Sequence, residues 1–198
     1  MFEEKSQFPM LQILDQDGKC NEKLMPKLGN EEIKKIYEWM VLVRKADEII
    51  WSLQREGRVL TYAPIRGQEA SQVASAFAMS KDDWLFPMYR SSACMAVRGA
   101  PLEMMLQYTA GDERGSKFPE GVNVFPIAVP VASQIPHAVG FAWGLKMQKK
   151  NAATVVYFGE GATSKADFHE VIKFAGVFKV PVVAICENNQ WAISVPTK

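Results

Sequence analysis

The 198-residue sequence has little of what marks secreted, zinc-binding or nucleic-acid-binding proteins. It contains three cysteines, Cys20, Cys94 and Cys186, which lie far apart and in no CxxC or Cys/His cluster. This usage argues against a disulfide framework and against structural zinc, and it is typical of a reducing cytosol. The net charge is +1 and no block of lysine and arginine occurs, so nothing favours nucleic-acid binding.

Targeting and membrane signals are also missing. The first residues, MFEEKSQF, are acidic, whereas a signal peptide begins basic and then turns apolar. No apolar run approaches the ~20 residues that a membrane-spanning helix needs. Hydrophobic residues make up 48% of the chain and charged residues 23%, which is ordinary for a globular protein. We therefore expect a cytoplasmic protein that binds neither nucleic acid nor membrane.

The chain divides into an irregular segment and a longer α/β part. Residues 1–29 carry proline and glycine with little periodicity, and they predict an extended N-terminal arm. Residues 30–198 predict one α/β domain, which begins with a long amphipathic helix capped by Asn30. Further helices are predicted at about 68–79, 101–110 and 133–150, and a short buried strand at 84–86, just before Tyr89 and Arg90.

The most informative stretch runs from Thr154 to Ser194. Two apolar runs, 155–158 and 180–186, flank a helical pattern, which predicts a βαβ unit with parallel, buried strands. The first run leads into GEG around Glu160, and the second into ENN ending at Asn189. Parallel strands end at one edge of a sheet, where ligands of open α/β sheets bind. We therefore expect Glu160 and Asn189 to lie together.

These residue types suit a hard cation that carries phosphate. Magnesium prefers oxygen ligands, which the Glu160 carboxylate and the Asn189 amide can supply. Gly161, Ala162 and Thr163 are predicted to lead into the helix, so that their free N–H groups and the helix dipole favour phosphate.

Residue spacing alone leaves other interpretations open. Gly159-x-Gly161-x-x-Ser164 approximates a dinucleotide-binding fingerprint with Glu187 as the ribose-binding acid, but the third glycine is missing. The segment GEGATSK superficially matches a phosphate-binding loop, but no glycine precedes Lys165 and no serine or threonine follows it. A plain turn after a strand is the third alternative.

GEG, then 26 residues, then NN resembles the thiamine diphosphate motif, whose usual form is GDG followed by NN at this spacing. From about Asp15 to Lys198 the chain is similar to the alpha subunit of the thiamine-dependent first component of 2-oxoacid dehydrogenase complexes. Its matching segments are RxGR at 55–58, GQEA at 67–70, FPMYR at 86–90, RGxPLE at 98–103, ASQIPxAVG at 132–140 and NNxxAIS at 188–194. GEG, AISVPT and DQDGK look most similar to branched-chain enzymes, whereas ENN also occurs in the pyruvate branch.

The resemblance implies roles for individual residues. Glu160, the Asn189 side chain and the Trp191 backbone carbonyl would hold Mg²⁺. Thiamine diphosphate would meet the backbone N–H groups of Gly161 and Ala162, the side chains of Tyr89 and Arg90, Val131 between its two rings, and the backbone near Val129 at its aminopyrimidine. Ser133 and Gln134 match positions that bind K⁺ in branched-chain members.

The resemblance also implies a thiamine diphosphate-binding fold, a parallel sheet flanked by helices, of which this chain is the amino-terminal portion. The expected reaction decarboxylates a branched-chain 2-oxoacid and transfers the acyl group to lipoamide on the dihydrolipoyl acyltransferase core. A beta subunit would complete an α2β2 enzyme and supply the glutamate that activates the cofactor, so no catalytic residue is assigned to this chain. His137 and His169 are expected to be structural or solvated and not catalytic. A pyruvate dehydrogenase alpha subunit, a truncated non-catalytic scaffold and an NAD-binding oxidoreductase are the alternatives.

Overall fold

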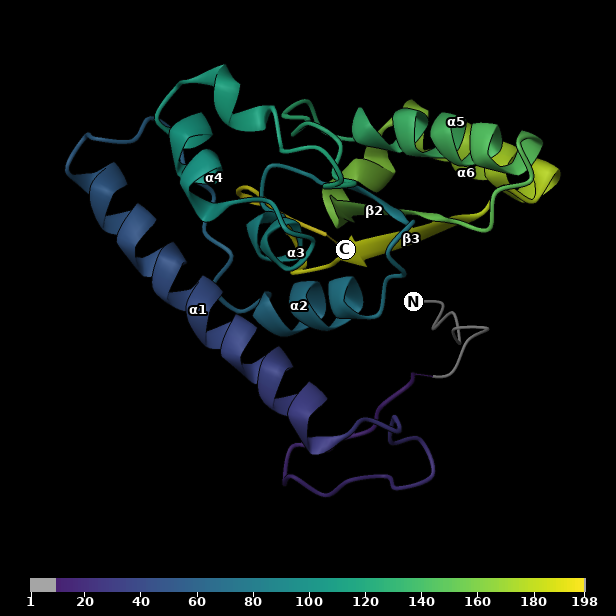
Figure 1. The fold of residues 1–198 in the computed structure, drawn as a ribbon, viewed down its shortest axis with the longest axis horizontal. Coiled ribbons are helices and arrows are strands. Elements are labelled where there is room, and N and C mark those ends of the chain that lie inside the picture. Colours follow the sequence, from purple (N-terminus) through teal and green to yellow (C-terminus); the bar gives the residue numbers. More distant parts are fainter. Residues whose placement is uncertain (1–9, 198) are drawn as a thin grey trace. The chain divides into compact units, whose positions relative to one another are not determined.

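The computed structural model describes residues 10–197, which form helices around a small parallel sheet (Figure 1). Each main element was predicted to within a few residues, because helical periodicity and stop residues mark the helices well. The helices are α1 (Asn30–Arg55), α2 (Glu69–Phe77), α3 (Ser92–Val97), α4 (Leu102–Thr109), α5 (Gln134–Met147) and α6 (Ala166–Phe178), with 3-10 turns η1 (Glu113–Ser116) and η2 (Glu160–Ser164). The strands are β1 (Trp84–Phe86), β2 (Thr154–Gly159), β3 (Val182–Glu187), β4 (Trp191–Ala192) and β5 (Val195–Pro196).

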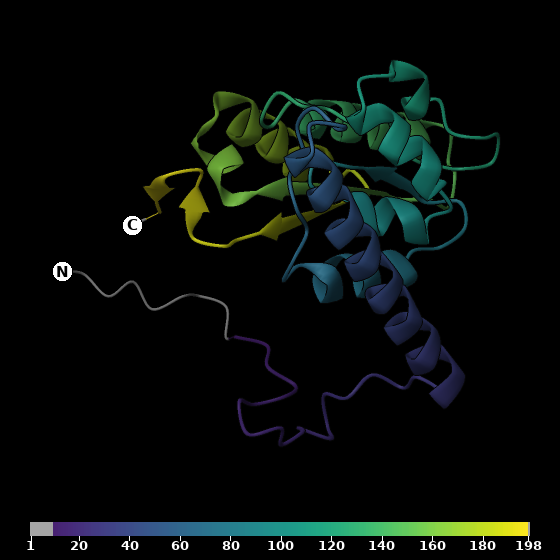
Figure 2. The ribbon, with the colours of Figure 1, turned by 90° about the vertical axis from the view of Figure 1, so that its left-hand side faces the viewer.

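The main sheet has the order β1-β2-β3, and both pairings are parallel. Its register aligns Phe86 with Val156 and Gly159 with Glu187, so all three strands end at one edge. This confirms the predicted α/β fold class, a parallel sheet flanked by helices. After β3 the chain forms the short antiparallel β4–β5 hairpin, yellow in Figure 2.

Alternate residues of the strands point to opposite faces of the sheet, as strand geometry requires. Leu85, Val155 and Tyr157 pack into one cluster with side chains of α2 and α3. Phe86, Val156 and their neighbour Phe158 pack into a second cluster with side chains of α5. Figure 1 shows α5 and α6 on one side of the sheet and α2 and α3 on the other. Both faces of β2 are therefore covered, which explains its continuous apolar sequence.

The prediction that β3 is buried was wrong. Val183 is 52% exposed, and Ala184 and Cys186 are also exposed. β3 pairs with a strand on one side only, so its outer edge meets no strand of the described chain. β3 therefore exposes some of its apolar side chains, although its composition is typical of a buried strand.

Residue contacts group 1–35 and 36–198 as two compact units. In the described part of the first, the Asp15 carboxylate accepts hydrogen bonds from the N–H groups of Asp17 and Lys19, and Leu14 bridges to Cys20. The predicted division into an arm at 1–29 and a domain at 30–198 stays a prediction. Within residues 10–197, no helix combines the length and the apolar character needed to span a membrane.

Candidate functional site

A cavity of about 300 Å³ opens at the carboxyl ends of β1, β2 and β3. Its wall also includes residues from the loop ahead of α5 and the residue ahead of α2. The tertiary structure thus brings together segments that are far apart in sequence, at the sheet edge where the sequence placed them. The predicted site residues that line it are Tyr89, Arg90, Val131, Gln134, Glu160, Gly161, Ala162, Asn189 and Trp191.

Glu160 is the carboxylate that was predicted to bind Mg²⁺. It follows β2 directly, lines the cavity and is only 8% exposed. Its Oε1 is buried and has no hydrogen-bond partner in the described chain. A buried carboxylate oxygen without a partner is costly, by roughly 1–3 kcal/mol or more. A bound cation would remove that cost.

Two further buried oxygens share this condition. The amide oxygens of Gln68 and Gln134 also lack a partner among residues 10–197, and both residues line the same cavity. The Gln134 amide is fixed, because its Nε2 donates to the Tyr157 carbonyl at 2.7 Å. All three unpartnered atoms are acceptors, so the cavity is complementary to cations or hydrogen-bond donors. An anion such as a diphosphate would need a cation between it and these oxygens.

Asn189 and Trp191 reach the cavity on the turn after β3. The Asn189 Oδ1 accepts the Trp191 N–H at 2.9 Å, which fixes the side-chain amide against its own turn. An amide oxygen has a second lone pair, so it can still bind a metal. No three His, Cys, Asp or Glu side chains gather as ligands in the described part of the chain. A hard cation here would therefore combine Glu160 with neutral oxygens and with ligands of its own.

Gly161 and Ala162 line the cavity and lead into the following helix as predicted, but through a 3-10 turn and not as its first α-helical turn. They lie in the 3-10 turn η2, and α6 begins only at Ala166 because Lys165 is extended, with φ −96° and ψ 140°. Thr163 Oγ1 donates to the Glu160 carbonyl at 2.7 Å, and this local bond competes with α-helical bonding. The dipole at this edge is therefore that of a single 3-10 turn. A Cβ on Gly161 would lie 3.2 Å from the Ala192 side chain, so the turn packs tightly.

Tyr89 and Arg90 line the opposite side of the cavity after β1. The Arg90 guanidinium donates to the Pro64 carbonyl, which anchors one of its nitrogens. Its other N–H groups are suited to the forked recognition of phosphate. Arg90 is the one arginine or lysine among the described residues that line the cavity.

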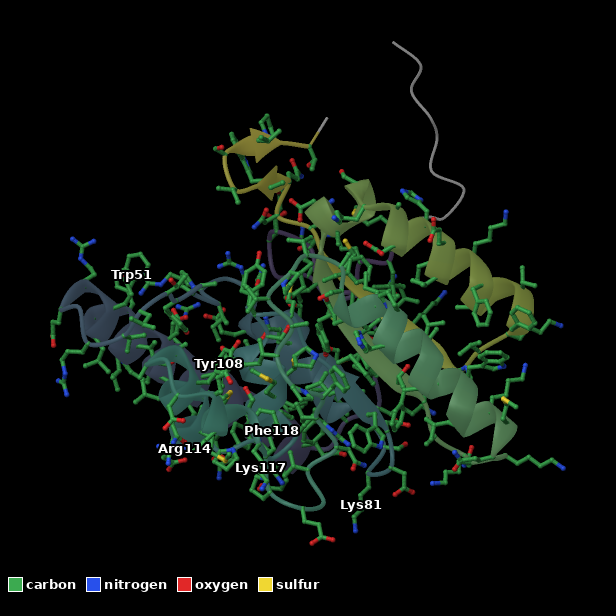
Figure 3. All side chains as sticks on the ribbon, turned by 90° about the horizontal axis from the view of Figure 1, so that it is seen from above. Trp51, Lys81, Tyr108, Arg114, Lys117 and Phe118 are labelled. Atoms are coloured by element: carbon green, nitrogen blue, oxygen red, sulfur yellow. The ribbon has the colours of Figure 1, made fainter. Side chains whose placement is uncertain are left out.

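Val129 and Ser133 do not line this cavity. Val129 borders a second, mainly apolar cavity of about 400 Å³, which shares Tyr89 with the first. Tyr108 of α4 also lines it, and Figure 3 shows this side chain away from the α5–α6 pair. The Ser133 hydroxyl is exposed and donates to the Pro130 carbonyl at 2.8 Å. Of the two residues predicted to bind K⁺, only Gln134 faces the cavity.

Glu187 was considered only as a ribose-binding acid, yet the structure shows a different environment. It is 7% exposed and lines the cavity, while its two carboxylate oxygens accept hydrogen bonds from Ser71 at 2.5 Å and Gln72 at 3.1 Å. Burial raises its pKa, and the hydrogen bonds from Ser71 and Gln72 partly offset this. Gln68, which also lines the cavity, was not predicted as a site residue. It directly precedes α2, more than 90 residues before Glu160 in the sequence, and a residue at a helix start carries no signal of a cavity.

Backbone strain also concentrates near the cavity. Of the five described non-glycine residues with positive φ, Ala132, Gln190 and Ile193 have φ values of 73°, 66° and 58°, and the other two, Lys149 and Lys179, follow the ends of helices. Ala132 and Ile193 line the cavity and Gln190 lies between Asn189 and Trp191. Positive φ is costly for a β-branched residue such as isoleucine, and such strain clusters at functional sites.

The two histidines have local partners, consistent with the structural roles expected for them. A ring nitrogen of His137 lies 2.8 Å from the Ser133 carbonyl, and one of His169 lies 2.7 Å from the Thr163 carbonyl. Neither residue lines the cavity.

Comparison with known proteins identifies the family of this chain. Residues 37–198 match the family described as dehydrogenase E1 component. The chain is 46% identical over 185 residues to the pyruvate dehydrogenase E1 component subunit alpha of Acholeplasma laidlawii, covering 93% of this chain and 54% of the relative. The same subunit of Staphylococcus epidermidis is 41% identical over 195 residues, covering 98% and 53%. The chain thus spans about half the length of these curated relatives.

A similar solved structure is a Mycobacterium smegmatis protein described as a thiamin diphosphate-dependent enzyme. The likeness has a TM-score of 0.42 at 17% identity and covers 65% of this chain and 22% of the other. It adds no argument of its own. The match over residues 37–198 and the identity of more than 40% to alpha subunits show that the chain belongs to the dehydrogenase E1 component family.

Proposed function

We propose that this chain supplies the metal–diphosphate half of a thiamine diphosphate site in the E1 alpha subunit of a 2-oxoacid dehydrogenase. The observation that carries the proposal is the set of buried, unpartnered oxygens of Glu160, Gln68 and Gln134 in one cavity. They call for a cation or for hydrogen-bond donors, while Arg90 on the opposite side suits a phosphate. A magnesium diphosphate supplies both charges.

In this proposal Glu160, the Asn189 amide oxygen and the Trp191 carbonyl hold Mg²⁺, and the backbone N–H groups of Gly161 and Ala162 contact the diphosphate. Tyr89 and Arg90 contact it from the β1 side. When bound, thiamine diphosphate supplies the carbon centre at which a 2-oxoacid loses carbon dioxide. This chain's residues bind and orient that cofactor, and the partially buried cavity limits access of water.

The remaining cofactor contacts follow the resemblance. Val131, which lines the cavity, supports the bend between the two cofactor rings. Val129 contributes its backbone to the aminopyrimidine from the neighbouring cavity. The buried Gln134 oxygen is a candidate ligand for K⁺, with Ser133 beside it.

We propose pyruvate as the first substrate to test, because the relatives at 41–46% identity are pyruvate dehydrogenase subunits. A branched-chain 2-oxoacid, favoured by the sequence motifs, has one structural observation in its support. The second cavity shares Tyr89 with the first, is lined mostly by apolar side chains such as Ile50, Leu60 and Met105, and has a volume of about 400 Å³. That is much more space than the methyl group of pyruvate needs.

The proposal extends to partners. A beta subunit would complete the site, in an α2β2 assembly in the cytoplasm, and the acyl group would pass to a lipoyl domain of a dihydrolipoyl acyltransferase. The test combines the complete protein with its beta subunit, thiamine diphosphate and Mg²⁺, and follows 2-oxoacid oxidation with an artificial electron acceptor. We expect turnover of pyruvate, and a comparison with 3-methyl-2-oxobutanoate decides the substrate. No turnover of any 2-oxoacid would refute the enzymatic proposal.

Calorimetry separates this function from a non-catalytic scaffold. Saturable binding of thiamine diphosphate that requires Mg²⁺ is expected. A protein that assembles with the beta subunit but shows no such binding would have only a scaffold role.

A further inference from the structure

Gln72 on α2 is the most highly connected buried polar side chain next to the cavity. It is fully buried and does not line the cavity itself. Its Nε2 donates to the Arg90 carbonyl at 2.9 Å and to the Glu187 Oε2 at 3.1 Å, and its Oε1 accepts the Ala93 N–H at 3.1 Å. One amide therefore uses both of its N–H groups and its oxygen on three partners, all of them far away in sequence.

Two of these partners, Arg90 and Glu187, line the cavity. Arg90 and Ala93 follow β1, and Glu187 ends β3, two residues before Asn189. β1 and β3 do not pair with each other, because β2 lies between them. No backbone hydrogen bond of the sheet therefore joins β1 to β3. Gln72 makes a direct connection between their carboxyl ends.

The connection acts on residues already assigned to cofactor binding. The Arg90 carbonyl accepts from Gln72 while the Arg90 guanidinium faces Pro64 and the cavity. The bond to Glu187 holds the last residue of β3, from which the Asn189–Trp191 turn departs. A side chain that fixes both ends sets the distance between the diphosphate-binding arginine and the metal-binding turn.

Resting on the proposed function, we infer that Gln72 is a positioning residue that ties the carboxyl ends of β1 and β3 together and so sets the width of the metal–diphosphate cavity. It touches neither metal nor cofactor. Partners that orient metal ligands in this indirect way change metal affinity by about 10–100-fold when they are removed.

Ser71 provides a matched control. It donates to the other oxygen of the same Glu187 carboxylate, at 2.5 Å, but makes no bond to the β1 side. A role limited to satisfying the Glu187 charge would make Ser71 and Gln72 equivalent. A role in connecting the two strand ends belongs to Gln72 alone.

The test uses the complete protein with its beta subunit and measures the Kd of thiamine diphosphate with Mg²⁺ by calorimetry, alongside the Tm without cofactor. We expect Gln72→Met, which keeps the length and packing of the side chain, to weaken binding by about tenfold or more. Ser71→Ala should stay within about threefold. Should Gln72→Met fail to fold, Gln72→Leu removes the same bonds with a shorter side chain, and the same loss is expected.

Two results would overturn the inference. One is a folded Gln72 variant with the Kd of the wild type, even at a lower Tm, since a merely structural role lowers the Tm alone. The other is an equal loss of affinity in Ser71→Ala. If the wild-type protein itself binds no thiamine diphosphate, the proposed function fails first, and this outcome is distinct from both.

Discussion

Two glutamates lie close together at the carboxyl edge of the sheet, but their hydrogen-bond partners differ. Glu160 follows Gly159 at the end of β2, and Gly159 pairs in register with Glu187 at the end of β3. The two side chains are 8% and 7% exposed. Glu160 has a buried oxygen with no partner in the described chain, whereas both oxygens of Glu187 accept hydrogen bonds from α2.

This difference teaches how to separate a ligand-binding carboxylate from a structural one. Residue type, burial and position at the sheet edge are the same for both. Only the count of hydrogen-bond partners tells them apart: the unsatisfied group is the one that a ligand must complete. Four substitutions test this distinction.

Glu160→Gln should have the largest effect. The amide keeps the shape of the side chain but removes the negative charge that a divalent cation would meet. We expect the Mg²⁺-dependent affinity for thiamine diphosphate to fall on the order of 100-fold, since a charged interaction of about 3 kcal/mol is lost. Calorimetry over a range of Mg²⁺ concentrations measures it. The Tm without cofactor should not fall, and an unchanged Kd would remove Glu160 from the site.

Arg90→Lys should have the next largest effect. Arg90 is related to both glutamates. It lines the same cavity as Glu160, and its charge partly offsets the rise that burial causes in the pKa of Glu187. Lysine keeps the charge but loses the planar fork that matches phosphate. We expect about tenfold weaker cofactor binding, from one lost charge-assisted hydrogen bond. Binding as tight as in the wild type would show that the charge alone, without the fork, is enough.

Glu187→Gln should change binding by less than about threefold, because the amide keeps an oxygen that can accept from Gln72 and gains an N–H group that can donate to the Ser71 hydroxyl. Its effect should appear in the pH dependence of stability. Burial raises the pKa of Glu187, so the stability that its protonated form contributes is fully present below the pKa of an unfolded glutamate and is lost as the pH rises through the folded pKa. The Tm of the variant relative to wild type should therefore increase by a few degrees from pH 4 to pH 8.

Thermal unfolding of both proteins in the same buffers measures that difference. A Tm difference that falls as the pH rises would contradict the assigned sign. A loss of cofactor affinity as large as that of Glu160→Gln would break the distinction between the two carboxylates.

Tyr157→Phe should have the smallest effect on binding. The Tyr157 hydroxyl is paired with Ser75 at 2.5 Å, on the α2 side of the sheet, and burial raises its pKa. Like the Glu187 carboxylate, it is a buried group with a hydrogen-bond partner on α2, but Tyr157 does not line the cavity. We expect a stability loss of about 1 kcal/mol and an unchanged Kd. A clear loss of affinity would mean that the Tyr157 hydroxyl, which bonds to α2 alone, also affects the site.

The order and type of the main elements could be predicted because their signals are local. The spacing of apolar residues predicted α1 and β2, and Gly and Pro marked most boundaries. The sequence-based predictions differ from the structure where local hydrogen bonds, or the lack of a neighbouring strand in the described chain, determine it. Thr163 and Lys165 interrupt the helix expected after Gly161, and β3 is exposed because it is an edge strand in the described chain.

The candidate site divides in the same way. Glu160 and Asn189 were predicted to meet because each follows a strand of one parallel sheet. The family resemblance added Arg90, which comes after a third strand. Gln68 and Gln72 could not be predicted in this way. Their roles depend on the packing of α2 beneath the sheet edge, which no spacing in the sequence describes.

The sequence by itself determined the βαβ unit, the paired GEG and NN segments and hence the edge at which a magnesium diphosphate is proposed to bind. Periodicity and motif spacing are properties of the chain alone. The tertiary structure adds that Glu160 keeps a buried oxygen with no partner in the described chain, whereas both oxygens of Glu187 are hydrogen-bonded. Hydrogen-bond partners more than 100 residues apart, such as Gln72 and Glu187, exist only once the helix has packed against the sheet.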